Sequence, residues 1–148
     1  MIIRLASTDD AVAVAQLNEA FNAVQTTPEC MAQRMAAAAN IERIYLAEID
    51  GMAVGFASLW IFPVACFPEP YAEVSELYVH MDYRRRGIGR ALMKETIRVA
   101  RTAGANELKL ITAFQNTAAQ QLYAELGFEK LALHLSLHLE SPGISLQP

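Results

Sequence analysis

The 148-residue sequence contains only two cysteines, Cys30 and Cys66, in unrelated contexts with no CxxC spacing and no cluster of histidine and cysteine. Such scarcity argues against a disulfide framework and gives no support for a zinc site. We therefore expect a reducing, cytoplasmic location and no bound metal.

Long hydrophobic runs are also missing. No apolar stretch approaches the ~20 residues that a membrane-spanning helix needs, and the N-terminus lacks the pattern of a signal peptide. Positive charge is scarce as well, since 12 Lys and Arg stand against 16 Asp and Glu, for a formal net charge of -4. This balance argues against general nucleic-acid binding, so we expect a soluble protein with neither a membrane nor a nucleic-acid partner.

Hydrophobic residues make up 53% of the sequence and charged residues 19%, which predicts one compact domain over residues 1–148 with a real core. Periodicity and turn signals predict strands and helices in a mixed order. In chain order these are a strand at 2–5, helices from 7 to about 24 and from 28 to 39, strands at 41–49, 52–62 and 74–80, a helix after 89, a strand at 108–112, a helix at 116–126 and a strand at 131–139. The fold class is therefore α/β, with a mixed (α+β) sheet and helices on both faces.

The last predicted strand rests on strict alternation, because leucines occupy every second position from Leu133 to Leu139. Dimerisation through this leucine-rich strand is a possibility. His134 and His138 share its other face, but about 13 Å separates them along a strand, too far to chelate one metal.

The segment from Arg84 to Gly89 reads Arg-Arg-Arg-Gly-Ile-Gly and lies between a β-forming run and an amphipathic helix. Glycines allow backbone N–H groups to approach a phosphate, and the helix that follows adds its positive dipole end. A P-loop would need Lys and Ser or Thr after the last glycine, where this chain has Arg90 and Ala91. The dinucleotide fingerprint would need a third small residue, where this chain has Leu92. The segment thus predicts an anion cradle of another kind.

A second motif lies downstream, where Asn116 starts a helix that carries Tyr123 and closes at Gly127-Phe128. Together with Arg84-x-x-Gly87-x-Gly89, and with Leu77-Tyr-Val-His before it, this segment resembles the acyl-CoA-binding half of the GNAT superfamily of N-acetyltransferases. The resemblance is specific from about Glu73 to Phe128. It implies the GNAT fold, a central mixed and mostly antiparallel sheet with helices on both faces and a splayed pair of central parallel strands.

The resemblance also implies an activity, the transfer of the acetyl group of acetyl-CoA to a primary amine of a small molecule or peptide. The amine would attack directly in a ternary complex, with no metal and no covalent enzyme intermediate. The alternative is a catalytically inactive CoA-binding regulatory or protein-interaction module.

Site residues follow from the matched motifs. The cradle of Arg84, Arg85, Arg86, Gly87, Ile88, Gly89 and Arg90 would hold the CoA pyrophosphate, chiefly through backbone N–H groups. Main-chain groups of Leu77, Tyr78 and Val79 would face the pantetheine arm, and the Val79 N–H could stabilise the oxyanion. Asn116 would bind the cofactor near the splay. Tyr123 would lie close to the thioester sulfur and donate a proton to the departing thiolate.

The general base is open between Glu73 and Glu76. The two differ in parity along one strand, so they point to opposite faces unless a bulge intervenes. Glu73 is expected to share a face with Leu77 and Val79 and occupies a position used by some members of the family, which favours it. A third reading is that both carboxylates are solvated and the amine arrives already neutral.

Overall fold

The computed structural model describes residues 1–137, which fall into two compact units, residues 1–111 and the residues from 112 onward. The first unit is built on a five-stranded sheet in the order β1-β2-β3-β4-β5. Its strands are β1 (Ile2–Leu5), β2 (Glu42–Ile49), β3 (Met52–Phe62), β4 (Tyr71–Val79) and β5 (Lys109–Leu110). Its helices are α1 (Ala11–Asn22), α2 (Pro28–Ala38) and α3 (Ile88–Thr102), with short 3-10 turns η1 (Thr8–Asp10) and η2 (Met81–Tyr83).

Neighbouring strands from β1 to β4 are antiparallel, and β4 and β5 are parallel. The predicted hairpin between β2 and β3 forms at Asp50-Gly51, where both residues adopt left-handed backbone angles with φ of 51° and 79°. Such angles match the twist of a two-residue hairpin. The parallel pair arises because α3 returns the chain across the sheet before β5 begins. The predicted mixed, mostly antiparallel sheet is thus confirmed.

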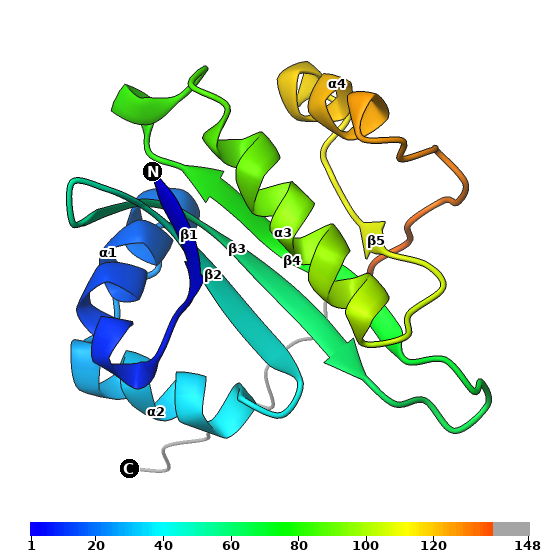
Figure 1. The fold of residues 1–148 in the computed structure, drawn as a ribbon, viewed down its shortest axis with the longest axis horizontal. Helices are drawn as coiled ribbons and strands as arrows, with labels where there is room; N and C mark the ends of the chain where they lie inside the picture. The colour runs from blue at the N-terminus through cyan, green and yellow to red at the C-terminus, as the bar shows by residue number, and fades with distance from the viewer. Residues whose placement is uncertain (138–148) are drawn as a thin grey trace, which may run out of the picture. The chain divides into compact units, whose positions relative to one another are not determined.

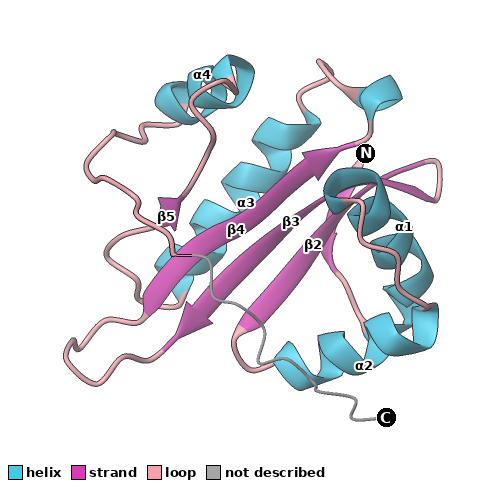
Figure 2. Ribbon diagram, turned by 180° about the vertical axis from the view of Figure 1, so that it is seen from behind, coloured by secondary structure: helices cyan, strands magenta, loops and turns pink. Residues whose placement is uncertain are grey.

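Helices cover both faces of this sheet, as the opposite views of Figures 1 and 2 show. One face carries Leu46, Phe56 and Tyr78, which pack in a buried cluster with residues of α1 and α2 such as Val14 and Met31. The other face packs against α3, which contacts β3 and β4 most and β2 and β1 less. The amphipathic pattern of α3 explains this placement, because its buried side chains recur at helical spacing. They are Ile88, Leu92, Met93, Thr96, Val99 and Ala100.

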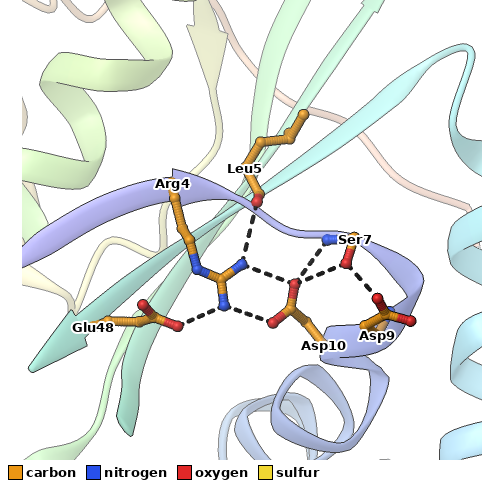
Figure 3. A network of polar contacts seen from close by, with 6 residues as sticks. All are labelled: Arg4, Leu5, Ser7, Asp9, Asp10 and Glu48. Carbon is orange, nitrogen blue, oxygen red and sulfur yellow. Dashed lines mark hydrogen bonds and ion pairs between the residues drawn. The ribbon is translucent and has the colours of Figure 1, made fainter. Parts of the chain in front are cut away.

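The start of the chain is tied to the sheet by a polar network around Arg4 (Figure 3). The Arg4 guanidinium donates to both carboxylate oxygens of Asp10, at 2.6 and 2.9 Å, and to Glu48 at 2.5 Å. Asp10 also closes a capping box with Ser7 at the start of η1. This ion pair lowers the pKa of Asp10 from 3.8 to about 2, mainly through the hydrogen bonds from Arg4. The network therefore joins β1, η1 and β2.

The second unit contains α4 (Thr117–Glu125), with Asn116 as N-cap and Gly127 in a left-handed conformation just after the helix. Residues 131–137 form no strand, and the leucines there are 75–82% exposed, so the strand predicted at 131–139 is wrong over this part. Alternation creates an apolar face but does not supply a neighbouring strand, and in residues 1–137 no strand pairs with this segment. Residues 138 and 139 lie outside the described residues.

Within residues 1–137, no helix has the length and apolar character that crossing a bilayer would require.

Candidate active site

The predicted anion cradle lies where β4 and η2 lead into α3. Arg85 and Gly87 have φ of 63° and 78°, so the chain turns through two left-handed residues before the helix starts. Gly87 is the N-cap of α3 and offers no side-chain cap. The backbone N–H groups of Ile88 and Gly89, at the start of the first helical turn, have no intrahelical acceptor in an α-helix and point along its axis. The turn therefore presents N–H donors and a positive dipole end to one place.

Two of the three arginines hold this turn in shape. The Nε of Arg84 donates to the Val79 carbonyl at 3.0 Å, and its guanidinium lies 5.9 Å from the centroid of the Tyr78 ring. Arg86 donates to the Asp82 carbonyl at 3.0 Å and lies over the Tyr83 ring. These contacts connect the turn to β4 and η2, so the two guanidinium groups have structural partners.

The edge of β4 next to the cradle is open. β4 and β5 pair only at Glu73 with Lys109 and at Val74 with Leu110 within residues 1–137. On its other side, the N–H of His80 donates to the carbonyl of Val54 at 2.9 Å. Bonded and non-bonded pairs alternate in an antiparallel ladder, so Leu77 and Val79 direct their main-chain groups away from β3. Within residues 1–137, the pairing of β4 with β5 therefore ends at Val74, because the strand predicted at 108–112 forms only over Lys109–Leu110. No strand of these residues pairs with Leu77 and Val79 on the side away from β3.

One glycine allows β3 to lie close to this edge. A Cβ placed on Gly55 would lie 2.7 Å from the Tyr78 carbonyl oxygen and 3.2 Å from the Val79 Cα. Gly55 is the partner of Val79 in the ladder, at a position where the two chains approach most closely. The main-chain geometry at Val79 thus depends on the absence of a side chain on β3.

A β-bulge in β4 changes which side chains share a face. The register moves from Val74 opposite Leu59 to Glu76 opposite Ser58, which leaves Ser75 as the extra residue. Glu73 and Glu76 consequently lie on the same face, the one covered by α1 and α2. The expectation that Glu73 shares a face with Leu77 and Val79 is wrong, because the inserted residue reverses the alternation between them.

The two candidate bases have different surroundings. Glu73 accepts a hydrogen bond from the hydroxyl of Tyr71, which together with burial raises the Tyr71 pKa to about 12. Glu76 accepts from the Nδ2 of Asn22, on the last turn of α1, at 2.9 Å. Burial raises the pKa of Glu76, and the Glu42 charge acts in the same direction, while the hydrogen bond from Asn22 opposes both. A carboxylate tuned upward by burial is the kind that can act as a base near neutral pH.

Asn22 and Glu42 lie at the sheet face covered by α1 and α2, and neither is among the site residues expected from the sequence. Glu42, at the start of β2, accepts hydrogen bonds from the Ser58 hydroxyl and from the Trp60 indole, the latter at 3.3 Å. Period-two alternation along β2 and β3 was the available signal, since it puts these side chains on the face of Ile44 and Leu46. Asn22 gave no such signal, because its contact spans 54 positions in the chain.

The motif from Asn116 to Phe128 lies in the second unit. The Asn116 Oδ1 accepts from the Ala119 N–H at 3.2 Å, which confirms its role as an N-cap. The Tyr123 ring packs edge to face on Phe128 at 5.9 Å, and burial raises the pKa of its hydroxyl. Across residues 1–137 there is no group of three His, Cys, Asp or Glu side chains placed to hold a metal ion.

Comparison with known families covers most of these elements. The model of the acetyltransferase (GNAT) family matches residues 12–128. The chain belongs to the GNAT family. The turn at the start of α3 and the parallel pair β4 and β5 therefore lie within the segment that the family model covers.

Two relatives and one solved structure illustrate the similarity of this GNAT chain. An uncharacterized N-acetyltransferase of Methanocaldococcus jannaschii is 34% identical over 89 residues, covering 58% of this chain and 38% of that protein. Aminoglycoside N(6')-acetyltransferase type 1 of Salmonella typhimurium is 29% identical over 89 residues, covering 58% of this chain and 61% of that protein. The structure of AAC(6')-Iy in complex with a bisubstrate analog, CoA-S-monomethyl-acetylneamine, superposes with a TM-score of 0.80 at 21% identity, covering 95% and 98% of the two chains. The matched segment thus spans about two fifths to three fifths of these two curated relatives.

Proposed function

We propose that this protein transfers the acetyl group of acetyl-CoA to a primary amine of a small molecule or peptide, by direct attack in a ternary complex. The observation that carries the proposal is the cradle at Arg85 to Arg90 beside the open edge of β4. A helix start that lacks a side-chain cap suits a pyrophosphate, and an unpaired strand edge suits an amide-bearing arm. Acetyl-CoA would supply the activated acetyl thioester.

The chain's own residues would divide the binding work. Backbone N–H groups of the cradle would hold the pyrophosphate, with Arg84 and Arg86 keeping the turn in shape. Leu77 would offer main-chain groups to the pantetheine arm, because it faces away from β3. Val79 faces the same way, but its carbonyl already accepts from Arg84, so its N–H is the group left for the cofactor. The Val79 N–H would stabilise negative charge that develops on the carbonyl oxygen. Asn116 is proposed as a further cofactor-binding residue.

Glu76 is the base that we propose, in preference to Glu73. It directly precedes the open edge at Leu77, and its burial favours the protonated form, so it can take a proton from an incoming ammonium group at moderate pH. Glu73 lies three residues further from that edge and is bonded to Tyr71. The proton removed from the amine would move to a Glu76 carboxylate oxygen.

Tyr123 is proposed as the acid. Its raised pKa keeps the hydroxyl protonated across the neutral range, so it remains able to donate to a thiolate that forms on departure of the acetyl group. The carboxylates of Glu42, Glu73 and Glu76 on one sheet face favour an acceptor that carries positive charge. A positively charged acceptor agrees with the name of one relative, an aminoglycoside N(6')-acetyltransferase, because aminoglycosides carry amino groups.

The test is release of free thiol from acetyl-CoA with a panel of primary amines, for wild type, Glu76→Gln and Glu73→Gln. We expect Glu76→Gln to lower kcat/KM by about a hundredfold or more and Glu73→Gln by much less. A larger loss in Glu73→Gln would reverse the assignment of the base. Tight CoA binding by calorimetry without turnover of any amine would favour the inactive CoA-binding module, and no CoA binding at all would refute both.

A further inference from the structure

A chain of side-chain amides reaches from α1 to the proposed base. The Nδ2 of Asn22 donates to the Asn18 Oδ1 and to the Glu76 Oε1, at 2.9 Å in each case. An amide nitrogen carries two hydrogens, so these two contacts use both and fix which way the Asn22 side chain is turned. Asn18 and Asn22 lie one helical turn apart on α1, at the spacing that places side chains on the same face.

We propose that Asn22 is a positioning residue for the acetyl transfer: it holds one oxygen of the Glu76 carboxylate and leaves the other oxygen to take the proton of the acceptor amine. The inference rests on the proposed function. Among the side chains of residues 1–137, Asn22 is the one that donates a hydrogen bond to Glu76, and it does so to Oε1. Asn18 then acts one step further away, by orienting Asn22.

The charged groups around Glu76 define what this contact does. Glu42 faces it from β2 across the same sheet face, and Glu73 lies on that face of β4 beyond the bulge. Both are acidic, while Ser58 and Trp60 of β3 are neutral and are bonded to Glu42. The amide of Asn22 is therefore the donor that favours the charged form of Glu76 against burial and against the Glu42 charge. Removing this donor should make Glu76 harder to deprotonate. As the pH is lowered, activity should therefore begin to fall at a higher pH than in wild type.

Two variants and two controls isolate this effect. Asn22→Ala removes the donor, and Asn22→Asp replaces it with a carboxylate of nearly the same shape. Gln25→Ala is the matched control, since the Gln25 amide, just after the same end of α1, donates at 3.0 Å to Glu19 of that helix. Asn18→Ala removes only the outer contact. Each protein is titrated by 13C NMR of the Glu76 carboxyl, identified by its loss in Glu76→Gln, and its kcat/KM is measured against pH with an accepted amine.

We expect Asn22→Ala to move the Glu76 titration to higher pH and to lower kcat/KM about threefold to tenfold at about pH 6, with less than about twofold loss at about pH 9. Asn22→Asp should move the Glu76 titration and the pH profile of kcat/KM at least as far as Asn22→Ala does. Asn18→Ala should move them less, and Gln25→Ala should match wild type in both. This ordering would support the inference, because a merely structural role would lower activity equally at all pH values.

Two results would overturn it. One is a Glu76 titration that is unchanged in Asn22→Ala, and the other is a titration that moves while the pH dependence of kcat/KM stays that of wild type. Failure of the proposed function looks different, because wild type would then acetylate no amine. In that case the catalytic role of Asn22 falls with it, while the NMR titration still decides whether Asn22 acts on Glu76.

Discussion

Replacement of Gly87 tests whether the backbone of the cradle, rather than its arginine charges, binds the pyrophosphate of acetyl-CoA. Gly87 has φ of 78°, and a Cβ added there meets no atom within 4 Å. Gly87→Ala therefore adds only the strain of a left-handed residue, about 1–2 kcal/mol in the free energy of unfolding. Gly87→Asp adds the same strain and a negative charge next to the expected anion.

The size of the charge effect follows from Coulomb's law. At about 5 Å two unit charges repel by roughly 0.8 kcal/mol in water and about 3.3 kcal/mol at an effective dielectric constant of ~20. The dissociation constant of acetyl-CoA should therefore rise between about fourfold and about 250-fold in Gly87→Asp. Arg85 is exposed and has φ of 63°. Arg85→Ala keeps a non-glycine residue at this left-handed angle, so the backbone strain is unchanged and only one screened charge is removed. Its effect should be about 0.3–1 kcal/mol, or about twofold to fivefold.

Calorimetric titration with acetyl-CoA measures both effects. Gly104→Ala is the matched control for strain, because Gly104 has φ of 88° with open space around it and lies just past the other end of the same helix. It should lose stability like Gly87→Ala while keeping wild-type affinity. A larger rise of the dissociation constant in Arg85→Ala than in Gly87→Asp, with both proteins folded, would show that the cradle has been misread.

Three further outcomes are expected. Tyr123→Phe should lower kcat at least tenfold while the dissociation constant of acetyl-CoA stays within about twofold, and an unchanged acetylation rate would remove Tyr123 as the acid. Gly55→Ala should lower the free energy of unfolding by about 1–3 kcal/mol in urea, because its Cβ would lie 2.7 Å from a backbone oxygen, and wild-type stability would mean that β3 and β4 can separate there. Asp10→Asn should cost about 1–2 kcal/mol at neutral pH, a contribution that is complete well above the unfolded pKa of 3.8 and is lost as pH falls to about 2; a cost that persists at pH 2 would contradict this.

Most elements of the first unit could be predicted from local signals. Capping by Ser7, Pro28 at the start of α2 and the Asp50-Gly51 turn each act within a few residues, so the sequence contains the whole cause. The predicted strand at 131–139 failed over its described part for the opposite reason. Its leucines alternate correctly, but a strand also requires a paired neighbour, which alternation does not provide.

The candidate site divides in the same way. The conformation of the turn proposed as the cradle was predictable, because a left-handed glycine, a preceding strand and a following helix are adjacent in the chain. The shared face of Glu73 and Glu76 was not, because counting parity places them on opposite faces and does not reveal that Ser75 is inserted opposite β3. Asn22 could not be found at all from local pattern, since its partner Glu76 lies 54 positions away.

By itself, the sequence determined most of the order of elements, the glycine-bearing turn between Arg84 and Arg90 that we propose as the anion cradle, and the resemblance to the GNAT family, because each depends on residues close together in the chain. Only the tertiary structure decided that Glu73 and Glu76 share one face of β4. That outcome depends on a register shift between β3 and β4 and on the packing of α1 over the sheet, which are properties of paired segments rather than of either segment alone.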